Sequence, residues 1–242
     1  MYFYYYILGI ILLPAIILSI YAQIKVNSTY NKYSKVMSNK NLTGKQVAER
    51  ILSESGISDV KVIETSGTLT DYYDSKNKVL ALSKANFNSS SIASAGVTAH
   101  ECGHAIQDAT NYFPLKLRQI VIKTYNLTSK LLIPLLIVGF LFDFILLIPK
   151  LANAFLIIGT IVFGLSLLMN LVTLPVEFNA SKRALKILDE TLILTPEETK
   201  QAKKVLSAAA LTYIAAFLYS LLNFLRFILI FANRRDWYKI NK

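Results

Sequence analysis

The sequence predicts a mainly α-helical membrane protein, with about four transmembrane helices and a small α+β aqueous segment that carries a histidine-containing helix. Three observations support this fold class. Of the 242 residues, 54% are hydrophobic, the formal net charge is +11, and the apolar residues gather in four long runs. Soluble domains with so many basic residues are rarely so apolar, so we expect basic aqueous segments between membrane spans.

The first apolar run, residues 2–24, carries no charge and is long enough to cross a bilayer. We interpret residues 1–24 as an uncleaved N-terminal anchor, because no basic segment precedes the run and no small-residue cleavage site stands near Ala22. The second and third runs, 131–148 and 151–176, are separated by Lys150 and predict a transmembrane helical hairpin over 131–176.

The fourth run, residues 205–230, is interrupted by Arg226. It predicts a C-terminal transmembrane segment and basic tail over 205–242, formed by one tilted helix or by a helix and a surface segment that ends at Asn233. The basic tail at Arg234 and Arg235 conflicts with a simple path of four spans, which would place it outside the cell.

The two remaining segments, 25–130 and 177–204, are basic near the predicted membrane. Their basic residues include Lys25, Lys32, Lys35, Lys40, Lys116, Arg118, Lys123, Lys130, Lys182, Arg183, Lys186, Lys200, Lys203 and Lys204. The positive-inside rule therefore places both segments in the cytoplasm. Basic and aromatic residues do not interleave in a nucleic-acid-binding pattern, so we expect the lipid bilayer as a partner and no nucleic acid.

The run His100-Glu101-Cys102-Gly103-His104 spells H-E-x-x-H and holds both histidines of the chain. Histidines four residues apart lie on one face of a helix, where both can bind a single ion, and Zn²⁺ suits imidazole ligands. Glu101 is then placed to act as general base on a water molecule. The alternative is that the H-E-x-x-H string arose by chance, on a helix whose two histidines bind no metal.

The surrounding residues favour a helix for this motif. Ser89, Ser90 and Ser91 offer an N-cap, small and apolar residues follow, and the next proline is Pro114. Cys102, the sole cysteine, excludes an intrachain disulfide and is expected to be a small packing residue.

A small sheet is expected before the motif. Thr43 is the predicted N-cap of a helix that ends near Gly56, and residues 60–63 read as a strand. Residues 68–73 and 78–83 predict two further strands joined by a turn. The edge of this sheet either binds an extended peptide through main-chain hydrogen bonds or forms a purely structural hairpin, and the sequence favours neither.

A third protein ligand must be a carboxylate, because no other histidine and no second cysteine exists. Glu177, just after the third apolar run and next to Pro175, is expected near the N-terminus of a new helical segment or at a kink. Position and chemistry leave Glu177 open against other acids, namely Glu190, Glu197, Glu198 and those of the segment 25–130.

Five stretches together resemble the YugP family of bacterial membrane zinc metallopeptidases. These stretches are residues 25–30, 67–71, 91–94, 100–107 and 174–181. The resemblance covers nearly the whole chain and implies a zincin-like aqueous segment at 25–130, with Glu177 in the segment 177–204. The family is similar to HtpX and related membrane gluzincins, whose third ligand is the glutamate of an E-x-x-A-D pattern.

The sequence Glu177-Phe178-Asn179-Ala180-Ser181 departs from that pattern in its last residue. In the gluzincins the final aspartate orients a zinc-binding histidine, whereas Ser181 can accept a hydrogen bond but supplies no charge. Ser181 and Asn179 are therefore candidate partners for the histidines, with Asp71 and Asp74 as further substitutes. Arg183 or a tyrosine is the candidate for stabilising the oxyanion.

These observations predict a zinc-dependent endopeptidase of the gluzincin type, with His100, His104 and Glu177 as Zn²⁺ ligands and Glu101 as the catalytic residue. The resemblance implies a multi-pass protein of the bacterial cell membrane that acts on peptides or membrane proteins in quality control. A noncatalytic zinc-binding membrane scaffold or adaptor is the alternative. An intramembrane protease is disfavoured, because polar residues flank the motif. The oligomeric state stays open.

Overall fold

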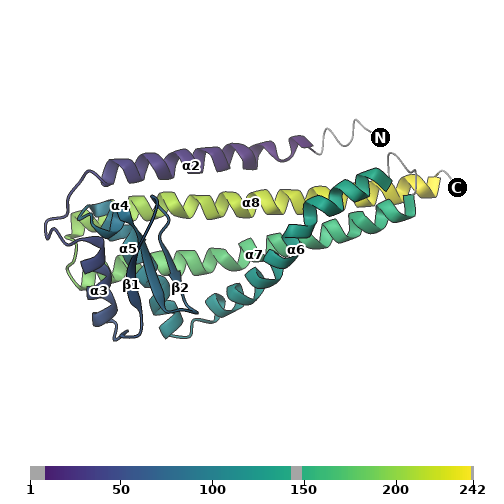
Figure 1. The fold of residues 1–242 in the computed structure, drawn as a ribbon. Helices are drawn as coiled ribbons and strands as arrows, with labels where there is room; N and C mark the ends of the chain where they lie inside the picture. Colours follow the sequence, from purple (N-terminus) through teal and green to yellow (C-terminus); the bar gives the residue numbers. More distant parts are fainter. Residues whose placement is uncertain (1–8, 143–148, 241–242) are drawn as a thin grey trace. The chain divides into compact units, whose positions relative to one another are not determined.

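The computed structural model describes residues 9–142 and 149–240 (Figure 1). The fold is mostly helical with one small sheet. Its elements are α2 (Leu13–Tyr33), α3 (Gly44–Glu54), β1 (Lys61–Thr65), β2 (Tyr72–Asp74), β3 (Val79–Ser83), α4 (Lys84–Phe87), α5 (Ile92–Ala109), α6 (Phe113–Phe140), α7 (Pro149–Glu190) and α8 (Pro196–Ile240).

The chain divides into two compact units. The motif unit, which contains the H-E-x-x-H sequence, comprises Tyr21–Lys116 and Leu174–Thr212. The helical unit comprises Met1–Ile20, Leu117–Thr173 and Tyr213–Lys242.

Helix α3 begins where the sequence predicts. The Thr43 side chain accepts a hydrogen bond from the backbone N–H of Gln46, and the Gln46 side chain accepts one from the Thr43 N–H, which completes a capping box. Gly56, with a φ of 68°, follows the end of the helix in the left-handed region that glycine adopts without strain. The apolar face of α3 is buried.

The sheet has the strand order β1-β3-β2, with β1 parallel and β2 antiparallel to β3. The predicted pairing of the last two strands is confirmed, but β2 is shorter than the predicted strand 68–73. Gly67 and Leu69 adopt positive φ angles of 105° and 56°, which interrupt an extended chain. The predicted strand 60–63 corresponds to β1, at Lys61–Thr65.

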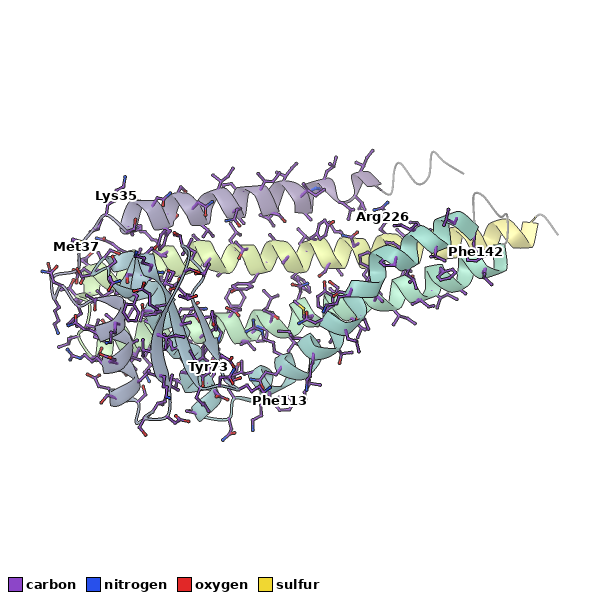
Figure 2. All side chains as sticks on the ribbon, in the orientation of Figure 1. Lys35, Met37, Tyr73, Phe113, Phe142 and Arg226 are labelled. Carbon is purple, nitrogen blue, oxygen red and sulfur yellow. The ribbon has the colours of Figure 1, made fainter. Side chains whose placement is uncertain are left out.

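Helix α5 carries the motif, and Ser91 is its N-cap. The Ser91 side chain accepts a hydrogen bond from the Ser94 N–H. In Figure 1, α3, α4 and the strands gather around this helix. Tyr73 of β2, labelled in Figure 2, donates its hydroxyl hydrogen bond to Asp108 near the end of α5 at 2.8 Å.

The core of the motif unit surrounds α5 with apolar side chains from α3, β3, α7, the α7–α8 connection and α8. Its largest fully buried apolar side chains are Val47, Ile51, Leu80, Leu82, Ile92, Leu188, Ile193 and Leu194. Burial of side chains of this size contributes about 1.5–3 kcal/mol each. The core thus fixes α5 against both α3 and α7.

Of the two readings of Pro175, the start of a new helical segment is wrong, and a kink stays a prediction. Pro175 lies inside α7, which continues unbroken from Pro149 to Glu190. Glu177 therefore stands in a helix interior, and the helix N-terminus expected to favour its carboxylate is not there. The boundaries drawn from hydropathy at residues 24, 176 and 205 likewise fall inside α2, α7 and α8. A drop in hydropathy along the sequence marks where the side chains become polar, and a helix can continue through that point.

In the helical unit, close helix contacts involve glycine. A Cβ added at Gly139 of α6 would lie 3.0 Å from the Phe155 Cβ of α7, and one at Gly164 would lie 3.2 Å from the Phe224 ring of α8. The rings of Phe163 and Phe227 stack with centroids 4.4 Å apart. Helices α6 and α7 thus pack together, whereas the connection of the predicted hairpin falls partly at 143–148, outside the described residues.

Within the described residues, two stretches are long and apolar enough to cross a membrane, Ile157–Glu190 of α7 and Pro196–Ile230 of α8. The predicted anchor 1–24 lies partly outside the described residues, and α2 continues beyond it to Tyr33. The path of about four spans stays a prediction.

Candidate metal centre

Three side chains that are suited to bind a metal converge from α5 and α7. His100 and His104 present their Nε2 atoms to one carboxylate oxygen, Oε2 of Glu177, at 3.2 and 3.5 Å. One ligand atom from each residue lies within 4.8 Å of the other two. The Glu177 side chain is only 3% exposed. The structure thus brings together the three residues that the sequence suggested as ligands.

Gly103, the last residue between the two histidines, lets α5 and α7 meet. A Cβ at this position would lie 2.5 Å from the backbone oxygen of Ala180. Ala180 follows Glu177 by three residues and therefore lies on nearly the same face of α7. The close approach of backbone to backbone directs the Glu177 side chain toward the histidines.

Ser181 lies beside the first histidine. Its Oγ is 3.1 Å from Nδ1 of His100. Because Ser181 follows Glu177 by four residues, one face of α7 supplies both a candidate ligand and a partner for a candidate ligand. The hydroxyl can accept a hydrogen bond from Nδ1–H, which leaves the Nε2 lone pair of His100 directed at the centre.

Gln107 is the partner of the second histidine, and the sequence reasoning did not assign it a role. Its Oε1 lies 3.0 Å from Nδ1 of His104, while its Nε2 donates to the backbone oxygen of Val176 at 2.8 Å. A carbonyl oxygen only accepts, so the amide nitrogen must face Val176 and the amide oxygen must face His104. Nδ1 of His104 then carries a hydrogen, and when the ring is neutral its Nε2 presents a lone pair.

A signal for Gln107 was present in the sequence. It is a polar residue three positions after a candidate ligand, it follows the apolar pair Ala105 and Ile106, and the structure shows that it is fully buried. A buried amide needs partners, and residues three apart on a helix are neighbours.

Asn179 and Arg183 of α7 lie behind Gln107 and are linked to it by hydrogen bonds. Asn179 Oδ1 accepts hydrogen bonds from Gln107 Nε2 at 3.0 Å and from Arg183 Nε at 2.8 Å. The Arg183 guanidinium also lies 5.9 Å from the ring centre of Tyr112. Asn179 thus reaches His104 only through Gln107, and Nε of Arg183 is engaged by Asn179.

The other acids considered for the centre have different partners. Asp71 accepts hydrogen bonds from the backbone and hydroxyl of Ser83 and from Asn86, and Asp74 caps the turn after β2. Glu190 pairs with Lys186, and Glu197 pairs with Lys200. Glu198 accepts from the backbone N–H groups of Thr195 and Asn39. None of these described contacts involves a histidine.

Glu101 follows the first histidine and is 8% exposed. Burial raises the pKa of the Glu101 carboxyl above its ordinary value, and the neighbouring His100 and His104 act in the opposite direction. Burial alone would lower the pKa of His104, but its contact with Glu177 and the charges of Glu101 and Glu177 raise it on balance. Burial also raises the pKa of the Cys102 thiol, which packs against α3.

The donor set fits a zinc ion. When both imidazoles are neutral with hydrogen on Nδ1, they and the carboxylate direct their lone pairs at a common point, and a cation placed there would offset the repulsion among these lone pairs. Two histidines and one glutamate are a set that catalytic zinc sites use. His100, His104 and Glu177 are therefore the residues that would hold the metal.

Comparison with known proteins agrees with this chemistry. Residues 8–232 match a protein family described as "putative neutral zinc metallopeptidase". The chain is 42% identical over 224 residues to a Bacillus subtilis (strain 168) protein named "Putative membrane protease YugP", a match that covers 93% of this chain and 96% of the relative. No solved structure matches. This chain therefore belongs to the family described as "putative neutral zinc metallopeptidase" and is associated with the membrane.

Proposed function

We propose that the protein is an integral membrane endopeptidase that uses zinc to hydrolyse peptide bonds. The observation that carries this proposal is the convergence of His100, His104 and Glu177, whose ligand atoms lie within 4.8 Å of one another. Glu101 is buried on α5, the helix that carries the two histidines. Family membership and the similarity to a membrane protease support it.

Zinc at this centre would lower the pKa of a water molecule to about 7 and polarise the carbonyl of the scissile bond. Glu101 accepts a proton from the attacking water and later delivers it to the amide nitrogen of the departing peptide. Gln107 and Ser181 hold the histidine rings in the tautomer that leaves Nε2 free. Burial raises the pKa of Glu101, which suits a group that must both take and return a proton.

Arg183 is our candidate donor to the carbonyl oxygen that becomes negative during the reaction. Its Nε is engaged by Asn179, so its two terminal nitrogens would be the donors. An extended substrate could add to β2, an edge strand of the sheet that is tied to α5 through Tyr73 and Asp108.

The catalytic mechanism is tested by the variant Glu101→Gln, which removes the base but keeps the size of the side chain. We expect zinc content, measured by elemental analysis of the purified full chain, to stay near that of the wild type. Hydrolysis of casein or unfolded membrane protein should fall by about 10²–10⁴-fold. Glu190→Gln, which alters an exposed ion pair on α7, is the matched control and should keep its activity.

Activity retained by Glu101→Gln in a clean preparation would refute the mechanism. The alternative function, a noncatalytic zinc-binding scaffold or adaptor, is supported by the uncharged Ser181 beside His100. It predicts that the wild type binds zinc but shows no hydrolysis that chelators abolish. Loss of zinc from Glu177→Ala, with zinc retained by Glu101→Gln, separates the ligand from the base.

We further propose a multi-pass topology with about four spans, in which the zincin-like segment faces the cytoplasm and processes peptides or membrane proteins for quality control. The basic residues of 25–130 and 177–204 support this orientation. The variant Lys76→Cys places a thiol in the exposed turn after β2, whereas the native Cys102 is buried. A membrane-impermeant thiol reagent should label this variant only in opened cells, and labelling in intact cells would reverse the orientation.

A further inference from the structure

The motif unit contains a basic cavity of about 700 Å³ between α2 and the first part of α8. None of the residues that line it belongs to the metal centre. They are Tyr21, Lys25, Ser28, Thr29, Lys32, Tyr33, Lys200, Lys203, Lys204, Ser207, Ala208 and Leu211. Proteolysis as proposed above gives this cavity no role.

The lining follows helical spacing on both walls. On α2, the residues Tyr21, Lys25, Ser28 and Lys32 are four, three and four positions apart and therefore share one face. Lys200, Lys203 or Lys204, Ser207 and Leu211 repeat the same spacing on α8.

Other contacts hold the two walls in place. The backbone N–H of Asn39, just after α2, donates to the Glu198 carboxylate at 2.7 Å. Tyr30 and Tyr33 of α2 pack in a buried cluster with Val205 of α8. The end of α2 thus lies beside the start of α8. Figure 1 shows that these two helices run in opposite directions.

The cavity gathers more positive charge than its surroundings balance. Five of the lining residues are lysines, and no lining residue is acidic. Lys200 pairs with Glu197 at 2.6 Å, and the Lys32 ammonium lies 5.4 Å from the centre of the Tyr33 ring. Within the described residues, Lys25, Lys203 and Lys204 have no ion pair. Like charges in one cleft repel one another and concentrate anions from solution, so a bound anion would offset the repulsion.

We propose that this cavity binds the phosphate of an anionic phospholipid headgroup. Because the helices are antiparallel, Lys32 and Lys200 lie at one end, while Tyr21 and Leu211 lie eleven residues away along each helix, about 16 Å. One end thus matches a phosphate and the other an acyl chain. A free phosphate ion would use only the lysine end.

The remaining polar residues of the cavity suit the same ligand. The hydroxyls of Thr29 and Ser207 can donate hydrogen bonds to phosphate oxygens between the two walls. Leu211 continues into the apolar part of α8, which is one of the two stretches able to cross a membrane. Basic pockets between membrane helices are a known form of lipid-headgroup site.

The test measures lipid retention by native mass spectrometry of the full chain in detergent. Phosphatidylglycerol and phosphatidylcholine with identical acyl chains are titrated in parallel, and inorganic phosphate is added as a competitor. The double variant Lys25→Gln/Lys203→Gln removes two of the lysines that have no ion pair. The control Lys35→Gln/Lys40→Gln removes the same charge from exposed residues outside the cavity, of which Lys35 is labelled in Figure 2.

We expect the wild type and the control to retain phosphatidylglycerol in preference to phosphatidylcholine. The cavity variant should bind phosphatidylglycerol roughly 25-fold more weakly, since each lysine near a lipid headgroup contributes about a fivefold preference. Equal loss in the control, or displacement of the lipid by millimolar phosphate, would overturn the proposal. Both double variants should keep the wild-type zinc content, which separates this test from that of the metal centre.

Discussion

Replacing Gly103 with alanine would insert one methyl group where α5 and α7 are closest. The added Cβ would lie 2.5 Å from the backbone oxygen of Ala180, about 0.9 Å short of the 3.4 Å at which ordinary contact begins. A backbone oxygen in a helix cannot rotate away, so the two helices must separate by an amount of that order. Overpacking of this kind costs about 1–3 kcal/mol.

The separation acts directly on the proposed ligand set. Glu177 lies one turn before Ala180, and its Oε2 lies 3.2 and 3.5 Å from the two histidine nitrogens. Metal–ligand distances tolerate deviations of only about 0.2 Å. We therefore expect Gly103→Ala to bind zinc more than tenfold more weakly, measured by competition with a chromogenic chelator, and to lose most of its hydrolytic activity.

Gly96→Ala is the matched control because it makes the same change on the same helix. Its added Cβ would lie 3.4 Å from the Ala202 Cβ, which is ordinary contact. Alanine is favoured over glycine in a helix by about 1 kcal/mol, so Gly96→Ala should unfold at the wild-type temperature or slightly above it. If Gly103→Ala bound zinc as tightly as Gly96→Ala does, the close approach at Ala180 would not be what positions Glu177.

Three further predictions test the surroundings of the centre. Gln107→Leu removes the acceptor that holds His104, and zinc affinity in the same chelator competition should fall by about 10–100-fold. Tyr30→Phe leaves the buried Asn86 Oδ1, which accepts from the Tyr30 hydroxyl at 2.7 Å, without that donor, and the free energy of unfolding should fall by about 1–3 kcal/mol in denaturant titrations. Cys102 has no exposed surface, so a thiol reagent such as dithionitrobenzoate should react with it only after unfolding, and fast reaction in the native state would contradict its burial.

Much of the local structure could be predicted from the sequence. Thr43 and Ser91 begin helices as expected, because a hydroxyl that caps backbone N–H groups acts within three residues of itself. The pairing of β2 with β3 was also predictable, since turn residues at 74–77 stand between two short strands, and the structure has the turn at 75–78. Asp74, whose carboxylate accepts from the N–H groups of Lys76 and Asn77, holds this turn.

The sequence misled where a proline was read as a boundary. Pro175 suggested either a helix start, with a favourable dipole for Glu177, or a kink, and the helix start is excluded because α7 continues through this position. Proline removes one backbone donor and disfavours a helix interior, but packing on both sides can outweigh that cost. Val176 and Ala180, both fully buried, flank the candidate ligand and are part of that packing.

The sequence by itself determined the pair of histidines four residues apart, the glutamate between them and the kind of metal that such a set prefers, because helical spacing and ligand chemistry are local properties. Only the tertiary structure decided which distant carboxylate joins them and that Ser181 lies beside the His100 ring. These choices depend on where α7 crosses α5, and that crossing is set by the absence of a side chain at Gly103 and by the core that clamps both helices. The contacts of His100 with Glu177 and Ser181 join residues 77 and 81 positions apart, a distance over which no local pattern carries information.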